Sequence, residues 1–152
     1  TGLFNRRGFN QLVRFTLSVA RRRAEPLTLG WLDLDRFKEI NDRYGHEEGD
    51  KALKIMAQLM RSAFREADML VRFGGDEFAV LFADTDEQGA WIAMQYLAEQ
   101  VESYNARKLH PWSLHFSWGL SEFDHNGNDL QQWLKDADEK MYAMKQQRQR
   151  AR

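Results

Sequence analysis

Two short acidic segments are the parts of the sequence best suited to chemistry. Asp33 and Asp35 alternate with leucine near the end of an apolar run, and Asp76 and Glu77 follow two glycines between two further apolar runs. Residues two apart in a strand point to the same face, so Asp33 and Asp35 would hold two carboxylates about 7 Å apart. Such carboxylates repel each other, and burying them is costly unless a cation offsets their charge. Either both acids are solvated beyond the end of the strand, or they hold a cation.

Such a cation site would contain only oxygen ligands. If the strand that ends near Asp33 and the turn that carries Asp76 meet at one edge of a sheet, their carboxylates lie together. Mg²⁺ typically takes one or two carboxylates and leaves its other positions to water and phosphate oxygens. The set contains neither histidine nor cysteine, which favours Mg²⁺ or Mn²⁺ over zinc. The alternative for Asp76 and Glu77 is a pair of solvated turn residues.

The neighbouring residues suit a phosphate group. Gly74 and Gly75 carry no side chains, so a phosphate or a ribose could approach the turn closely. The helix expected after Asp35 begins near Arg36, and a helix N-terminus presents free N–H groups to anions. Lys38 adds a positive charge there, although an exposed helical lysine is the preferred interpretation of that residue taken alone.

The elements that position these groups follow from the spacing of apolar residues. Spacings of three and four residues predict helices, and short apolar runs predict strands. Two glycines between two such runs predict a hairpin. The predicted helices cover residues 9–19, 36–44, 46–64, 90–101 and 130–144, the predicted strands cover 27–34, 69–73, 78–82 and 112–120, and residues 146–152 are expected to fray.

The order of these elements predicts a single mixed domain. Helices and strands in this order predict an α/β sandwich, in which helices cover a largely antiparallel sheet. The 152 residues suit one domain, and no repeat or linker divides them. Because the sequence begins at Thr1 rather than at methionine, we expect it to be part of a longer protein.

Composition argues against several classes of function. A net charge of −1 gives no basic field for nucleic acid or a membrane surface, and no apolar run approaches the roughly 20 residues that a membrane span needs. The chain has no cysteine, which excludes disulfides and thiolate zinc sites and agrees with a cytoplasmic location.

Several ordered motifs together resemble the GGDEF domain, the catalytic domain of diguanylate cyclases. The motifs are TGLFNRRGF at residues 1–9, LDLDRFKEINDRYGHEEGDKAL at 32–53, RFGGDEF at 72–78, FSWGLSE at 116–122 and DADEKMYAMK at 136–145. They cover nearly the whole chain, and Phe4 replaces the proline that the family usually has. The resemblance implies a nucleotide-cyclase or polymerase-palm fold for residues 1–152.

The resemblance also implies a reaction. Two GTP condense to cyclic di-3′,5′-GMP with release of two pyrophosphates, assisted by two Mg²⁺ per active site, for which Mn²⁺ could substitute. Each domain binds one GTP, so two domains must face each other as a homodimer. The alternative is a catalytically silent module that only senses GTP or cyclic di-GMP. The acids whose loss would indicate silence, namely Asp33 and the pair Asp76 and Glu77 after Gly75, are intact.

The resemblance assigns the acids to metal binding and catalysis. Asp33, Asp76 and the Leu34 carbonyl match metal ligands, and Glu77 would complete the shell of the second ion. Asp76 also matches the general base that activates the ribose 3′-hydroxyl, while Lys38 would stabilise developing charge.

Further positions match the substrate site. Asn41 and Asp50 match guanine readers, because a carboxylate accepts the N1–H and N2–H₂ donors that adenine lacks. Asp50 could equally complement a helix N-terminus. His46 matches a residue that lines the same pocket, with helix capping as an equal alternative. Phe37 and Lys38, together with Gly74 and Gly75, match the positions beside the phosphates.

Lys145 matches a lysine that contacts the triphosphate. The family often has an arginine four residues later, where this chain has Gln149. Arg148 could replace it, because residues three and four apart share a helix face.

Arg65 and Asp68 match the Arg-x-x-Asp product site of the family. Arginine can read guanine O6 and N7, and the aspartate can take the N1 and N2 donors. The resemblance therefore implies feedback inhibition by cyclic di-GMP, with a surface ion pair as the alternative. We expect the domain to be the C-terminal catalytic part of a sensor protein, which could be tethered to the inner membrane through N-terminal regions.

Overall fold

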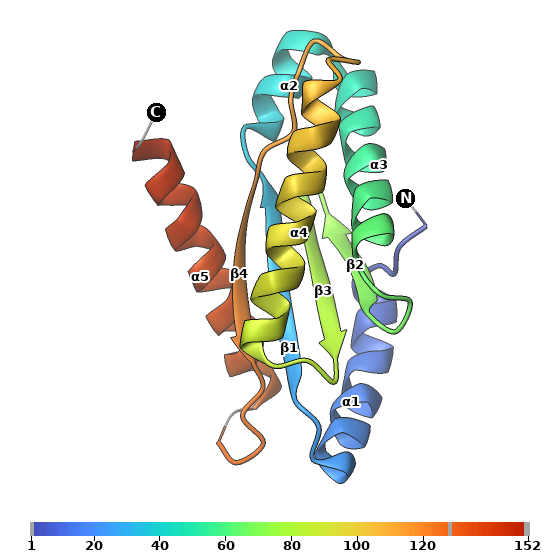
Figure 1. The fold of residues 1–152 in the computed structure, drawn as a ribbon, viewed down its shortest axis with the longest axis vertical. Helices are drawn as coiled ribbons and strands as arrows, with labels where there is room; N and C mark the ends of the chain where they lie inside the picture. Colours follow the sequence, from blue (N-terminus) through green and yellow to red (C-terminus); the bar gives the residue numbers. More distant parts are fainter. Residues whose placement is uncertain (1, 128, 151–152) are drawn as a thin grey trace.

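A four-stranded antiparallel sheet lies at the centre of the computed structural model, which describes residues 2–127 and 129–150 (Figure 1). Its order is β2-β3-β1-β4, so the first strand in the sequence is one of the two central strands. This confirms the predicted antiparallel sheet. The strands are β1 (Leu27–Leu34), β2 (Met69–Gly74), β3 (Glu77–Ala83) and β4 (Phe116–Glu122).

Helices cover both faces of the sheet. One cluster of buried side chains joins the sheet to α2, α3 and α4, and a second joins its other face to α1 and α5. In Figure 1, α4 crosses the near face of the sheet, and α5 runs beside β4. The helices are α1 (Arg6–Arg23), α2 (Phe37–Tyr44), α3 (His46–Ala63), α4 (Glu87–Ala106) and α5 (Leu130–Arg150). Among the described residues, no helix combines the length and the apolar character needed to cross a bilayer.

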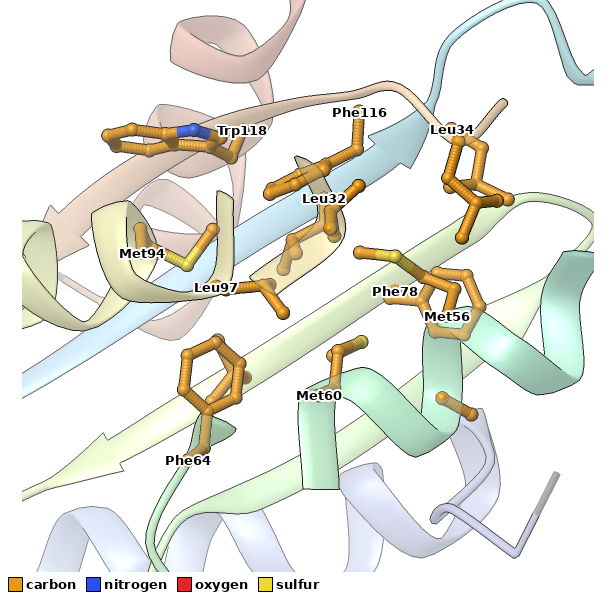
Figure 2. Close-up of a cluster of buried hydrophobic side chains, with 14 of the residues drawn as sticks. Leu32, Leu34, Met56, Met60, Phe64, Phe78, Met94, Leu97, Phe116 and Trp118 are labelled. Carbon is orange, nitrogen blue, oxygen red and sulfur yellow. The ribbon is translucent and has the colours of Figure 1, made fainter. Parts of the chain in front are cut away.

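Strand β1 is buried on both faces, which explains its nearly continuous apolar sequence. Leu32 and Leu34 pack with Met56 and Met60 of α3 in the cluster that Figure 2 shows. The alternate residues of β1 face the other layer, where Trp31 joins α1 and α5. Asp33 belongs to this second face and is the one acidic residue in β1.

The pairing of β1 with its neighbours brings the two acidic segments together. Asp33 lies opposite Glu77 in the register of β1 and β3, and the Leu34 N–H donates to the Asp76 carbonyl at 3.1 Å. Gly74 ends β2 and Gly75 opens the turn, with φ values of +131° and +53°, a region that strongly favours glycine. The hairpin therefore delivers Asp76 and Glu77 to the end of β1.

Two predicted boundaries were wrong. The strand expected at residues 112–120 is formed by Phe116–Glu122, because β1 ends opposite Phe116 and offers no further partner. The Asn105 side chain instead bonds both backbone groups of Leu114, at 2.8 and 2.9 Å. The tail expected to fray from residue 146 is helical to Arg150, where the described part of the tail ends.

The segment before α1 pairs with the outer edge of the hairpin. Phe4 forms a parallel bridge with Val71 of β2. Its N–H donates to the Leu70 carbonyl at 3.0 Å, and its carbonyl accepts from the Arg72 N–H at 2.8 Å. Residues next to α1 therefore cover part of the edge of the strand that leads into the Gly-Gly turn.

Candidate functional site

Asp33 and Asp76 form the acidic centre of the site. The Asp76 side chain lies close enough to Asp33 to share a hydrogen bond and to repel it. Asp33 is largely buried, whereas Gly74 and Gly75 are exposed on the turn beside it. The two acids that we expected to meet at one edge of the sheet do so.

A lysine from the last helix reaches this pair. The Lys145 ammonium lies 2.9 Å from Asp33 Oδ2 and donates to the Leu34 carbonyl at 3.2 Å. It also lies 3.9 Å from Asp35 Oδ1. A residue more than a hundred positions away in the sequence is thus a counter-ion of Asp33, and it also lies near Asp35.

Asp33 retains its proton more readily than an ordinary aspartic acid. Burial is the main cause, followed by the hydrogen bond with Asp76, and together with repulsion from Asp76 they raise the pKa of Asp33 to about 7. Lys145 acts in the opposite direction but does not outweigh them. The site therefore disfavours negative charge on Asp33.

Glu77 lies beside this pair in a different environment. Among the described residues, no three acidic, histidine or cysteine side chains come close enough together to hold one metal ion. Asp33, Asp76 and Glu77 therefore do not form a three-carboxylate cluster that could hold one metal ion. Burial, then Asp138 of α5 and Asp76, raise the pKa of Glu77.

The turn that carries the acids is held from two sides. The Arg72 guanidinium donates to the Gly75 carbonyl at 2.9 Å. Phe73, at an irregularity in β2, stacks on Trp31 with ring centroids 4.6 Å apart and meets Phe9 of α1 edge-on at 5.4 Å. These contacts connect α1 and the centre of the sheet to Phe73, near the end of β2.

The donor atoms present fit a divalent magnesium-type ion. Two carboxyl groups and a backbone carbonyl are the hard oxygen ligands that Mg²⁺ prefers. Asp33 Oδ1 is buried, and no donor within the described residues bonds it.

Helix α2 opens next to the acids and suits a phosphate. Its first residue is Phe37, and no side chain caps its N-terminus, so free N–H groups remain there. Lys38 is exposed on the first turn, which agrees with a phosphate contact and with a simple surface lysine. Arg36, the residue before the helix, adopts a left-handed conformation with φ of +57°.

The expected guanine readers lie where α2 meets α3. Asn41 packs so closely against Gly49 that a Cβ on Gly49 would lie 1.9 Å from Asn41 Oδ1. Asp50 follows Gly49 and is exposed. Gly45 rather than His46 is the N-cap of α3, so the capping interpretation of His46 is wrong. Glu47 and Glu48 provide the acidic first turn, which leaves Asp50 available for another role.

Arg148 lies one helical turn beyond Lys145. It donates to the Phe116 carbonyl and lies 3.4 Å from Asp35 Oδ2. Asp35 is buried and also accepts from the Ser117 hydroxyl at 2.8 Å. Asp35 is therefore bonded within the protein and is not solvated, and Arg148 would have to leave these partners to reach a phosphate.

Arg65 and Asp68 connect the end of α3 to β2. Their side chains pair at 3.1 Å, and Asp68 also accepts from the backbone N–H groups of Arg65 at 3.0 Å and Ala83 at 3.3 Å. The Asp68 side chain is only 2% exposed, whereas that of Arg65 is 58% exposed. A cavity of about 430 Å³ is lined by Arg65, Ile92 and Tyr96, among others. The ion pair is present, and Arg65 still faces open space.

Several residues that shape the site were not singled out from the sequence. Gly49, Arg72 and Phe73 also lie within the quoted motifs, but their roles depend on contacts between elements that a motif does not show. Asp138 could have been found from the α5 motif, because it falls within the quoted residues 136–145.

The comparisons define the class of this protein. The family model described as "Diguanylate cyclase, GGDEF domain" matches residues 1–151. The chain therefore belongs to the GGDEF domain family. This confirms the resemblance found in the sequence motifs.

Named relatives and a solved structure agree with this assignment. NbdA of Pseudomonas aeruginosa, named a cyclic di-GMP phosphodiesterase, is 38% identical over 90% of this chain and 18% of its own length. DgcC of Escherichia coli K12, named a probable diguanylate cyclase, is 33% identical over 95% of this chain and 39% of its own length. The structure of the diguanylate cyclase SiaD from P. aeruginosa, in complex with its activator SiaC, superimposes with a TM-score of 0.86 at 31% identity, over 97% of this chain and 56% of that one. This chain spans less than two fifths of either curated relative.

Proposed function

We propose that this domain is an active diguanylate cyclase, which condenses two GTP into cyclic di-3′,5′-GMP and two pyrophosphates. The observation that carries the proposal is the meeting of Asp33 and Asp76 beside an exposed Gly-Gly turn. A module that had lost catalysis would have no need to keep two mutually repelling carboxyl groups, one of them largely buried. Membership of the GGDEF family and the relationship to DgcC support the same reaction.

The acids would act on the reacting atoms. Asp33, Asp76 and the Leu34 carbonyl would hold Mg²⁺ or Mn²⁺, with Glu77 completing a second ion's shell. Bound metal supplies charge neutralisation at the α-phosphate and the pyrophosphate leaving group. Asp76 would take the proton of the ribose 3′-hydroxyl, and Lys38 would offset the charge that develops on the phosphate.

The remaining residues would bind and select GTP. Asn41 and Asp50 would read the guanine edge, with His46 beside them. Phe37 and the first turn of α2, together with Gly74 and Gly75, would border the phosphates. Lys145 and Arg148 of α5 would reach the triphosphate from the other side of β1.

Turnover with Asp76→Asn tests the proposal. The wild-type domain is incubated with GTP and Mg²⁺, and the product is identified by mass spectrometry. Asp76→Asn keeps the shape but removes a charged ligand and base, so we expect the rate to fall by about 10²- to 10⁴-fold while circular dichroism and GTP binding are retained. A folded variant that keeps more than about a tenth of the rate would show that Asp76 is not the base.

A second candidate is a silent module that binds GTP or cyclic di-GMP. The relationship to NbdA favours it, because a domain of this kind can occur in a protein named a phosphodiesterase. It predicts binding of the nucleotide without any cyclic di-GMP, which the same incubation detects. We further propose that the domain is the C-terminal part of a longer cytoplasmic sensor protein, tethered to the membrane through other regions if at all.

A further inference from the structure

The position of the Lys145 ammonium is the least expected feature of the site. It donates to the Leu34 carbonyl and pairs with Asp33, and it approaches Asp35 as well. Its side chain is 18% exposed, so it is enclosed by these oxygens and does not reach freely into solvent. A single positive charge thus occupies a set of carboxylate and carbonyl oxygens.

These oxygens are also the donors that suit a divalent metal ion. The ammonium bonds Asp33 Oδ2 and the Leu34 carbonyl, so a magnesium-type cation that took the same two groups as ligands would lie within a few ångströms of it. Like charges at such short range also repel strongly in a partly buried site. Binding of the metal therefore requires Lys145 to move away.

We propose that Lys145 is an internal counter-ion that competes with the metal for Asp33 and Leu34, and that metal binding releases it. In the metal-free protein the ammonium compensates the charge of β1. When the metal arrives, the side chain loses these partners and points into the site as a free cation. The chain thereby couples occupancy of the metal site to the appearance of a mobile positive charge beside it.

The release would set an order of binding. If the proposed function is correct, the freed ammonium is available to a triphosphate only after the metal has entered, so metal and nucleotide favour each other's binding. This second step rests on the proposed function. The competition for Asp33 and Leu34 does not, because it requires no nucleotide.

Nucleotide-free Mn²⁺ binding tests the competition. Free Mn²⁺ is measured by electron paramagnetic resonance during titration of the wild type and of Lys145→Met, which removes the charge and keeps an unbranched side chain. Since a hydrogen bond to a charged group corresponds to about tenfold or more in an equilibrium constant, we expect Lys145→Met to bind Mn²⁺ about tenfold more tightly. Equal or weaker binding by the folded variant would overturn the proposal, because a merely structural lysine gives no gain in metal affinity.

Arg148→Met is the matched control for the loss of charge. Arg148 lies on the same helix and near the same acids, but it contacts Asp35 and Phe116 rather than Asp33 and Leu34. We expect its effect on Mn²⁺ affinity to stay within about threefold, since a cation that does not share the ligands acts only through screened charge. A tenfold gain in Mn²⁺ affinity in both variants would mean that the loss of any nearby positive charge has this effect. That result would overturn the proposed competition.

A measurement on the wild type covers the case in which Lys145→Met fails to fold. Lysines are labelled briefly with acetic anhydride and quantified by mass spectrometry, with and without Mg²⁺. Release of the ammonium predicts that Mg²⁺ raises labelling of Lys145 relative to Lys135, whose side chain is already 68% exposed. Unchanged or reduced labelling of Lys145 would overturn the proposal. A domain that makes no cyclic di-GMP but passes these tests would refute the proposed function alone.

Discussion

A largely buried aspartate on a central strand is an unusual thing for a domain to retain. Asp33 lies among apolar residues of β1, and its Oδ1 atom is buried with no partner in the described chain. Lys145 compensates only part of the charge, since the pKa of Asp33 still lies near 7. The Asp33 side chain therefore lowers the stability of the metal-free fold, and the loss grows with the fraction of Asp33 that is ionised.

The first prediction is a pH dependence of metal-free stability. In the unfolded chain Asp33 loses its proton near the ordinary aspartate pKa of 3.8, whereas the pKa of about 7 in the folded state lets Asp33 hold the proton to a higher pH. Stability should therefore fall as pH rises between these values and then level off, because the unfolded state releases the proton first. A shift of at least one pKa unit corresponds to about 1.4 kcal/mol, or a Tm about 3–5 °C lower.

Thermal unfolding in EDTA at pH 5 and pH 8 measures this effect. Other groups titrate in the same range, so the comparison is with Asp33→Asn, which should show a smaller fall in Tm. Saturating Mg²⁺ at pH 8 should recover the loss in the wild type. The same pH dependence in both proteins would mean that Asp33 does not carry it.

A second residue-scale prediction concerns the recognition of guanine in GTP. Asp50→Ala should weaken GTP binding by about tenfold or more, because a charge-assisted pair of hydrogen bonds to guanine is lost. Metal affinity should not change, since Asp50 lies on α3 away from the acids of β1. Calorimetry with a non-reactive GTP analogue measures the change, and an unaltered affinity would remove Asp50 from the guanine site.

At the scale of elements, the junction between α3 and β2 is the best candidate for feedback. Asp68 is buried and bonds the backbone at both Arg65 and Ala83, so it fixes the junction to the end of β3. Arg65 bonds the Ala83 carbonyl and the Thr85 hydroxyl but keeps more than half its side chain exposed. A ligand bound to Arg65 would therefore act on the strand that leads into the Gly-Gly turn.

Arg65→Ala tests whether this junction is a product site. We expect the initial rate to remain near that of the wild type, while the affinity for cyclic di-GMP falls by about tenfold or more with the loss of a bidentate guanine contact. Progress curves should then no longer flatten as product accumulates. If both proteins bind cyclic di-GMP equally, Arg65 and Asp68 form only a structural ion pair, and the variant should merely lose some stability.

Elements could be predicted from the sequence where their structure depends only on residues close together in the chain. The hairpin and its Gly-Gly turn followed from the sequence, because glycine and two apolar runs act over a few residues. The start of β4 was not predicted correctly, because it depends on where its partner strand β1 ends, and β1 is distant in the sequence. The contact of Lys145 with Asp33 was beyond prediction for the same reason, since it depends on how α5 lies against the sheet. The burial of Asp68 likewise depends on bonds to β3.

At the scale of the whole molecule, the proposed reaction requires one kind of site to form two equivalent bonds. Cyclic di-GMP contains two phosphodiester links, whereas the proposed site has one candidate pair of metal-binding acids, Asp33 and Asp76. A two-fold pair of domains supplies both bonds from one kind of site. A net charge of −1 gives little attraction or repulsion between copies.

We therefore predict that the isolated domain is mostly monomeric and that its specific activity rises with protein concentration. Dilution series at fixed GTP and Mg²⁺, with sedimentation at the same concentrations, provide the measurement. An excess of Asp76→Asn should lower the activity of the wild type, because mixed pairs complete only one bond. A sedimentation-confirmed monomer whose specific activity is constant would contradict the two-domain mechanism.

The bridge between Phe4 and β2 has a consequence for how the protein behaves in solution. Strand β2 is the outermost strand on its side of the sheet, and Phe4 bonds the Leu70 carbonyl and the Arg72 N–H that would otherwise be open. An open edge of this kind is a template for pairing with another chain. A chain shortened to begin at Arg6 should therefore aggregate more readily than the full sequence, with β2 of one molecule recruiting β2 of the next into a continuous sheet.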